Sequence, residues 1–178
     1  SVGYGFSAKE ASEIAFEAGC IYVQKKHNEP IFPEELSKTK FVSLNYLKDR
    51  NFKLAFTNGC FDILHIGHID LLNKSKELGD VLIVGINSDN SVRALKGPNR
   101  PINSEDDRAF ILSSLNAVDH VIIYEEETPL NLLALINPKV LTKGGDYTHD
   151  QIVGHEYVES HEGIAVSIPI RFNKSTTA

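Results

Sequence analysis

The sequence feature that most constrains this chain is the stretch Phe56–Asp70, which joins an apolar run to a helical pattern through glycines and two histidines. The apolar run Phe52–Phe56 predicts a buried strand, and the pattern Ile69–Leu78 predicts a helix. A strand, a tight turn and a helix start together form an anion-binding site, because free backbone N–H groups and the helix dipole both favour negative charge. We therefore expect a phosphate-binding site here, to which His65 and His68 add side-chain donors.

The spacing of the two histidines leaves two other interpretations open. As a metal site the pair is incomplete, because no third ligand lies at a telling distance and zinc-binding helices use His-x-x-x-His. As a purely structural feature, His65 would cap the helix and His68 would be a satisfied core residue. The complete string Gly-x-Phe-Asp-x-x-His-x-Gly-His, placed between a strand and a helix, favours phosphate binding. We expect no metal site made of protein ligands alone.

Length and composition narrow the class of protein. The 178 residues suffice for one domain with a sizeable core, or for one domain and an appendage. The net charge of −6 argues against a nucleic-acid partner, and no apolar run approaches the length of a membrane span or forms a signal peptide. The two cysteines, Cys20 and Cys60, form no disulfide framework, which favours a reducing cytoplasm. The missing Met at position 1 indicates a piece of a longer protein.

From Phe52 onward, apolar runs alternate with helical patterns, which predicts a parallel sheet with helices on both faces. Four further strands are expected at Val81–Gly85, His120–Tyr124, Val140–Leu141 and Ile164–Ile168. Helices are expected after the caps Ser104, Thr128 and Thr148, the second with Pro129 in its first turn and an end at Asn137. Residues 52–178 are therefore predicted to form a Rossmann-like three-layer α/β/α sandwich with a five-stranded parallel sheet.

The first forty residues have a different pattern. Ser7–Glu10 is a capping-box sequence, and the small apolar face that follows predicts a short helix ending at Gly19. Gly3–Ala8 matches a dinucleotide fingerprint only superficially, because no strand precedes it. Residues 1–38 are expected to belong to a separate unit, and residues 39–51 to form a linker with a short helix.

Polar residues follow four of the expected strands, at the carboxyl ends where ligands bind in sheets of this kind. The four segments are Thr57–Asp62 with the two histidines, Asn87–Asp89, Lys143–Asp146, and Arg171 with Ser175–Thr177. In the third segment the glycines permit close backbone approach, Lys143 can meet a phosphate, and Asp146 can meet a hydroxyl or an amine. The fourth segment would offer hydroxyls and N–H groups to a phosphate if it begins a helix, and is otherwise an ordinary tail.

Four cations, Arg93, Lys96, Arg100 and Arg108, lie close together in an otherwise acidic chain. One interpretation is a solvated basic loop, and the other is a flexible arm that closes over phosphate groups. Arg108 is expected early in a helix, where a cation is unfavourable unless an anion is near. This favours function for Lys96 and Arg108, whereas the acidic run Glu125–Glu127 is expected to be solvated.

The string around His65 and His68 resembles the signature of the cytidylyltransferase-like nucleotidyltransferases. Within that superfamily, of the HxGH type, the chain is most similar to the heptose 1-phosphate adenylyltransferases. The residues that carry the resemblance are Thr57–Asp62, Leu95–Gly97, Arg100-Pro101, Val118-Asp119, Thr128-Pro129, Lys143–Tyr147 and Ser175–Thr177. In addition, 11–36 resembles the last helix and strand of a ribokinase-like sugar kinase, which implies a kinase domain fused upstream.

The resemblance implies transfer of an adenylyl group from ATP to heptose 1-phosphate by direct displacement, with Mg²⁺ accompanying ATP, in the cytoplasm, for lipopolysaccharide core synthesis. It also implies a homo-oligomer, a dimer. By the same resemblance the catalytic residues are His65, His68 and Lys96, and the sugar phosphate is bound by Lys96 and Arg171. The implied nucleotide-binding residues are Asn58, Gly59, Cys60, Phe61, Asp62, Gly67, Asn87, Asp89, Arg108, Lys143, Gly144, Asp146, Ser175, Thr176 and Thr177.

Two other functions remain open at the level of sequence. A cytidylyltransferase acting on glycerol 3-phosphate or a similar small phosphate shares the histidine string, but Lys143–Asp146 favours the adenylyl-transferring group. A nucleotide-binding module without catalysis is the other alternative, against which both histidines and the cluster of cations argue.

Overall fold

The computed structural model describes residues 51–145 and 147–169, which form a five-stranded, wholly parallel sheet in the order β3-β2-β1-β4-β5. The strands are β1 Leu54–Gly59, β2 Val81–Asn87, β3 His120–Tyr124, β4 Val140–Gly144 and β5 Ile164–Ile168. Because β1 pairs with both β2 and β4, the strand order reverses beside β1. The carboxyl end of β1 therefore lies at the position where ligands bind in open parallel sheets.

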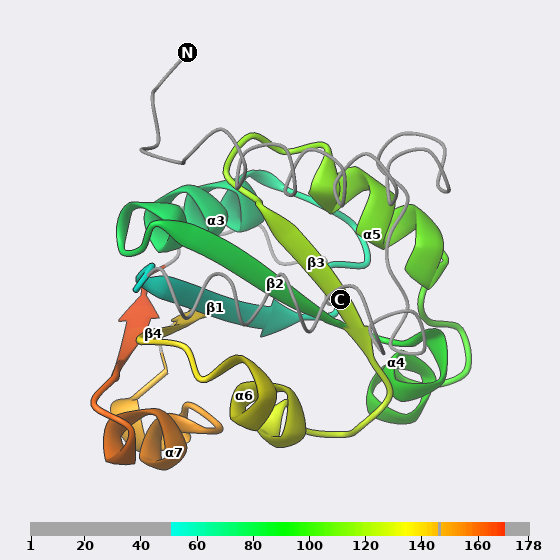
Figure 1. Ribbon diagram of the computed structural model, residues 1–178. Helices are drawn as coiled ribbons and strands as arrows, with labels where there is room; N and C mark the ends of the chain where they lie inside the picture. Colours follow the sequence, from blue (N-terminus) through cyan, green and yellow to red (C-terminus); the bar gives the residue numbers. More distant parts are fainter. Residues whose placement is uncertain (1–50, 146, 170–178) are drawn as a thin grey trace, which may run out of the picture.

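Helices cover both faces of this sheet, which gives three layers (Figure 1). The α-helices are α3 Ile66–Glu77, α4 Asp89–Lys96, α5 Glu105–Ser113, α6 Leu130–Ile136 and α7 His155–Ser160, and η2 His149–Gln151 is a 3₁₀ turn. α3 and α5 lie on one face, while α6 and α7 lie on the other. The expected Rossmann-like sandwich is confirmed.

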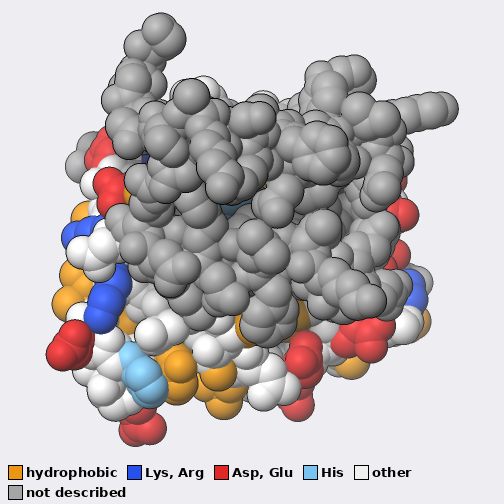
Figure 2. Space-filling model, viewed as in Figure 1, with side chains coloured by type: hydrophobic (Ala, Val, Ile, Leu, Met, Phe, Trp, Pro, Cys, Tyr) orange, Lys and Arg blue, Asp and Glu red, His pale blue; other side chains and the backbone are white. Residues whose placement is uncertain are grey.

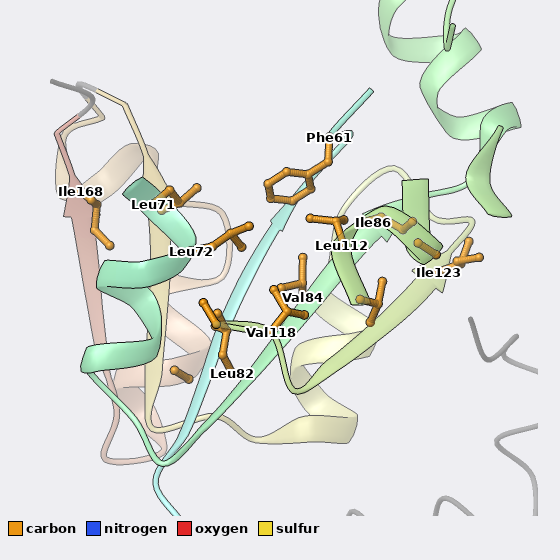
Figure 3. Packing of buried hydrophobic residues seen from close by; sticks show 14 of the residues in the cluster. Phe61, Leu71, Leu72, Leu82, Val84, Ile86, Leu112, Val118, Ile123 and Ile168 are labelled. Carbon is orange, nitrogen blue, oxygen red and sulfur yellow. The ribbon is translucent and has the colours of Figure 1, made fainter. Parts of the chain in front are cut away.

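Two apolar cores hold the layers together. On one face Leu71 and Leu72 from α3 and Leu112 from α5 converge on the sheet residues Leu82 and Val84 (Figure 3). On the other face α6 and α7 pack on a second set that includes Phe56, Ile83 and Leu141. The central strands are thus buried on both sides, which explains why they read as continuous apolar runs.

A buried hydroxyl network ties α3 to the reversal point of the sheet. Thr57 Oγ1 donates to the Thr142 carbonyl at 3.0 Å, and Thr142 Oγ1 lies 2.7 Å from Ser75 Oγ on α3. All three side chains are fully buried, so these hydrogen bonds satisfy groups that would otherwise cost free energy. The network fixes β1, β4 and α3 relative to one another just below the carboxyl end of the sheet.

Several local expectations differ from the structure. The first strand begins at Leu54 and continues to Gly59, because polar Thr57 and Asn58 still pair with β2. Thr128 is not the cap of α6: Pro129 occupies that position without a side-chain hydrogen bond. The helix expected after Thr148 is divided into the 3₁₀ turn η2 and α7, which begins only at His155. Arg93 and Lys96, which one interpretation placed in a solvated loop, both lie on α4.

β2 and β4 extend two and three residues beyond their expected ends, and α3 begins three residues earlier and ends one residue earlier than expected. Other boundaries agree with expectation. β3 and β5 have the expected bounds, α5 is capped by Ser104, and Asn137 ends α6 in a left-handed conformation. Thr148 caps a single 3₁₀ turn, η2. The proposed units 1–38 and 39–51 lie outside the described residues except for Asn51.

Charge and hydropathy of the described part add two observations. In Figure 2 acidic side chains stand at several places around the edge of the visible face, and the coloured part shows no continuous basic patch. Among the residues that the structure describes, no helix is long and apolar enough to span a membrane.

Close packing at the centre of the sheet predicts the effect of Gly85→Ala. A Cβ at this position would lie 2.8 Å from Phe56 Cζ and 3.2 Å from Leu132 Cδ2. We expect this overpacking to lower the free energy of unfolding by about 1–3 kcal/mol, measured by urea denaturation. In a Phe56→Leu background the same substitution should cost less, because the contacting ring is absent; equal costs in the two backgrounds would contradict the contact.

Candidate functional site

The site begins at the N-terminus of α3, where His65 is the capping residue. Its Nδ1 accepts a hydrogen bond from the Gly67 backbone N–H at 3.1 Å. In the neutral imidazole this bond places the proton on Nε2, which becomes a donor. The expected structural role of His65 as a cap is therefore present together with a free donor for a ligand. The two interpretations do not exclude one another.

His68 lies one turn further on and stacks against the first imidazole. The ring centroids of His65 and His68 are 3.9 Å apart with planes 23° from parallel, and the centroid of the Phe61 ring lies 5.1 Å from that of His68. Burial, followed by the electrostatic effect of the neighbouring His65 and Lys96, lowers the pKa of His68 from 6.5 to about 4. The backbone of Ile63 raises the pKa of His68, although the buried Nδ1 of His68 makes no hydrogen bond of normal geometry. His68 is thus neutral at pH 7.

Lys96 completes this group from a different element. It is the last residue of α4, its side chain is exposed, and it is close enough to His68 to lower the pKa of that imidazole. Gly97 follows with φ +94, a conformation that favours glycine, and ends the helix there. The structure thus places Lys96 on α4 near the histidine pair of α3, and the catalytic role of these three residues stays a prediction.

The loop between β1 and α3 is held in an unusual conformation. Phe61 has φ +48 although it is not glycine, and its ring is buried in the core. The next residue, Asp62, accepts hydrogen bonds from Arg100 Nη1 at 2.7 Å and from the backbone N–H groups of Ile102 and Asn103 at 2.7 and 3.1 Å. Burial alone would raise the pKa of Asp62, but these donors together lower it. The carboxylate is thus engaged by the protein and is a poor candidate for a Mg²⁺ ligand.

Arg108 lies beneath the same loop and joins three segments. Only 1% of it is exposed, and its guanidinium donates to the Cys60 carbonyl at 2.7 Å, the Asn103 carbonyl at 3.1 Å and Asp89 Oδ1 at 2.8 Å. The Asp89 carboxylate is the anion that the sequence analysis required near this cation. Both residues were expected to bind nucleotide; that role stays a prediction, and in this structure they position the loop.

Amide and hydroxyl groups line the carboxyl ends of β1, β2 and β3. Asn58 Nδ2 donates to Tyr124 Oη at 3.0 Å, Cys60 Sγ lies 3.8 Å from Asn87 Oδ1, and Asn87 Nδ2 donates to Ser91 Oγ at 3.0 Å. Burial raises the pKa of Tyr124, which stays a neutral hydroxyl. The sequence analysis did not select Tyr124, although its place as the last residue of a predicted strand was an available signal.

Lys143 reaches the same rim from β4. Its Nζ donates to the carbonyl of Asn58 at 3.2 Å and lies 3.4 Å from Asn58 Oδ1. Burial lowers the pKa of the ammonium. Gly144 is needed beside it, because a Cβ there would lie 2.8 Å from Leu71 Cδ2 on α3. The close approach of β4 to α3 thus depends on glycine.

The other expected site residues are distributed as follows. Gly59 ends β1 and Gly67 donates to the cap at the start of α3, so both lie at the histidine group. Asp146, Arg171, Ser175, Thr176 and Thr177 lie outside the described residues. Within 51–145 and 147–169 no three His, Cys, Asp or Glu side chains are arranged to hold a metal ion.

A parallel α/β sandwich with two stacked imidazoles at a helix N-terminus, beside the reversal point of the sheet, is an arrangement suited to binding phosphate groups. Comparison with known proteins identifies the family to which this domain belongs. Residues 56–171 match the cytidylyltransferase-like family, and the chain belongs to this family. It is accordingly a nucleotidyltransferase.

The relatives agree with this assignment. The chain is 43% identical over 190 residues to the "Bifunctional protein HldE" of Geotalea uraniireducens and 56% identical over 126 residues to that of Hyphomonas neptunium, matches that span 97% and 71% of this chain. They span only 39% and 26% of those relatives. Among solved structures, the lipopolysaccharide core biosynthesis protein of Thermoplasma volcanium is 29% identical with a TM-score of 0.56, covering 69% of this chain and 99% of that one.

The buried position of His68 predicts a pH dependence of stability. Its pKa is about 4 in the folded chain and 6.5 when unperturbed, so the unfolded chain binds a proton first as the pH falls. We expect the free energy of unfolding to decrease from pH 7 to pH 5, and to decrease less in His68→Asn, which cannot titrate. Urea denaturation at both pH values checks this; equal pH sensitivity of the two proteins would contradict a buried, neutral His68.

Proposed function

We propose that this chain transfers an adenylyl group from ATP to heptose 1-phosphate, giving ADP-heptose and pyrophosphate, as a step in lipopolysaccharide core synthesis. The observation that carries the proposal is the group formed by His65, His68 and Lys96 at the N-terminus of α3. Membership of the cytidylyltransferase-like family supports nucleotidyl transfer. Similarity to the lipopolysaccharide core biosynthesis protein of Thermoplasma volcanium supports the pathway, and the residues 143–147 support adenylyl transfer over cytidylyl transfer.

The reaction is a direct displacement at the α-phosphorus of ATP. A non-bridging oxygen of the acceptor phosphate forms the new P–O bond, and the bond to the β-phosphate breaks with its electron pair leaving on pyrophosphate. No protein nucleophile is required, so Cys60 has no covalent role. Catalysis then consists of positioning the two substrates and stabilising charge on the α-phosphoryl oxygens.

The described residues fit these two tasks. His65 offers Nε2–H because its Nδ1 is occupied by the helix cap, and neutral His68 offers its own Nε2 from the same face of α3. The N-terminus of α3 adds a favourable dipole, and the Lys96 ammonium adds a full positive charge. Asp62 and Arg108 hold the connecting loop so that these donors keep their places.

Mg²⁺ would enter with ATP and neutralise part of the triphosphate charge. The described residues supply no cluster of carboxylates for it, and Asp62 is already occupied by three protein donors, so the phosphates themselves would be its principal ligands. We further propose that Arg171 and Ser175–Thr177 bind phosphate groups, that the enzyme is a cytoplasmic dimer, and that a sugar kinase domain precedes it. The word "bifunctional" in the relatives' name and their greater length support the last point.

Pyrophosphate release tests the function. The full chain is supplied with Mg²⁺, each of the four nucleoside triphosphates, and heptose 1-phosphate, glycerol 3-phosphate or no acceptor. Release that requires both ATP and heptose 1-phosphate is the expected result. Activity with CTP and glycerol 3-phosphate would retain the mechanism and overturn the substrates, while tight nucleotide binding without any release would indicate a non-catalytic module.

Removal of either imidazole is expected to lower kcat by at least about 10²–10³-fold, because each supplies a preorganised donor to the transition state. The informative variants are His65→Asn, which retains a helix-capping side chain, and His68→Ala. His161→Ala is the matched control, since His161 is exposed at the end of α7 on the opposite face of the sheet. Near-normal turnover in either site variant would refute the proposed role.

A further inference from the structure

Two groups of polar side chains lie at the carboxyl end of the sheet, on opposite faces. Thr57 and Thr142 face α3, where they meet Ser75. Because side chains alternate along a strand, the next residues, Asn58 and Lys143, face the side covered by α6 and α7. Tyr124, which packs in the core on that side, bonds to Asn58 and confirms this orientation. The histidines belong to the α3 face, and Lys143 belongs to the other.

Among the described residues, Lys143 differs from Arg100 and Arg108 in having no acidic partner. Arg100 pairs with Asp62 and Arg108 pairs with Asp89. In the part of the chain that the structure describes, Lys143 instead meets only neutral oxygens, the carbonyl and the amide Oδ1 of Asn58. A largely buried ammonium with neutral partners alone is costly, and an anionic ligand would relieve that cost.

Tyr124 and Asn58 hold this ammonium in place. Asn58 donates its amide nitrogen to Tyr124 Oη, so its Oδ1 is turned toward Lys143 Nζ. The amide orientation is thereby fixed by a buried hydroxyl on β3. Lys143, Asn58 and Tyr124 all lie on strands of the sheet. This arrangement is expected of a preorganised binding group rather than of a surface lysine.

The in-line geometry of the proposed displacement indicates which phosphate group lies near Lys143. In an in-line reaction the leaving pyrophosphate and the attacking oxygen lie on opposite sides of the α-phosphorus. The helix N-terminus and both histidines supply the α3 side with donors for the nucleotide phosphates. We propose, on the basis of the adenylyl transfer proposed above, that Lys143 is the counter-cation of the acceptor phosphate, positioned by Asn58 and Tyr124. This reassigns Lys143 and Asn58 from the nucleotide to the sugar 1-phosphate.

The test compares Lys143→Met, which retains length and removes charge, with Lys139→Met. Lys139 precedes the same strand at its opposite end and bonds to the His161 carbonyl, so it reports the loss of a lysine away from the site. In Lys143→Met we expect the KM for heptose 1-phosphate to rise at least about tenfold and the KM for ATP to stay within about twofold. Lys143→Arg should recover part of the loss, and the control should match the wild type.

A rise in the KM for ATP with an unchanged KM for the acceptor would overturn the proposal and return Lys143 to the nucleotide. Tyr124→Phe, which removes only the hydroxyl, should raise the acceptor KM by a smaller factor, and it serves as the second variant if Lys143→Met fails to fold.

Calorimetric titration of heptose 1-phosphate into the wild type and Lys143→Met separates this proposal from the proposed function. Binding at least about tenfold weaker in the variant supports the acceptor role of Lys143. This conclusion holds even if the wild type releases no pyrophosphate, because absence of release contradicts only the proposed reaction. Equal affinities of the two proteins for heptose 1-phosphate, or no binding of heptose 1-phosphate to the wild type, would contradict the acceptor role of Lys143.

Discussion

The arrangement of the site depends on one buried guanidinium. Arg108 has almost no exposure to water, and its charge is tolerated because Asp89 and two backbone carbonyls surround it. These partners belong to the loop after β1, the segment before α5 and the start of α4. The loop carries the strained Phe61, and α4 carries Lys96 at its far end. A single side chain therefore fixes the relative positions of the elements that supply the donors of the site.

The two polar networks near β1 have different tasks. The hydroxyls of Thr57, Ser75 and Thr142 are satisfied in the core by one another and by backbone carbonyls, and they require nothing from a ligand. At the rim, by contrast, Asn58 and Lys143 leave a charge without an acidic partner among the described residues, and the buried Nδ1 of His68 has no hydrogen-bond partner there. Completeness of hydrogen bonding thus separates the groups that stabilise the fold from those that we propose bind substrates.

Periodicity and motif spacing predicted most of the sheet and the histidine group, because buried parallel strands are continuous apolar runs and the histidine string stands at a strand–helix junction. Two features of the structure could not be predicted from the sequence. α4 has a polar sequence whose helical state depends on the Ser88 cap and on Arg108, which is distant in sequence. The burial of Arg108, the pairing of Asp62 with Arg100 and the approach of Tyr124 to Asn58 join residues 19 to 66 positions apart, and no local pattern carries such contacts.

The cap formed by His65 has a consequence for assembly of the site. The same nitrogen that begins α3 determines which tautomer the ring adopts, so the first turn of the helix and a correctly protonated donor arise in one event. A chain in which this turn has frayed loses the dipole, the free N–H groups and the tautomer together. The stability of this single helical turn therefore determines whether all three features are present together or absent together.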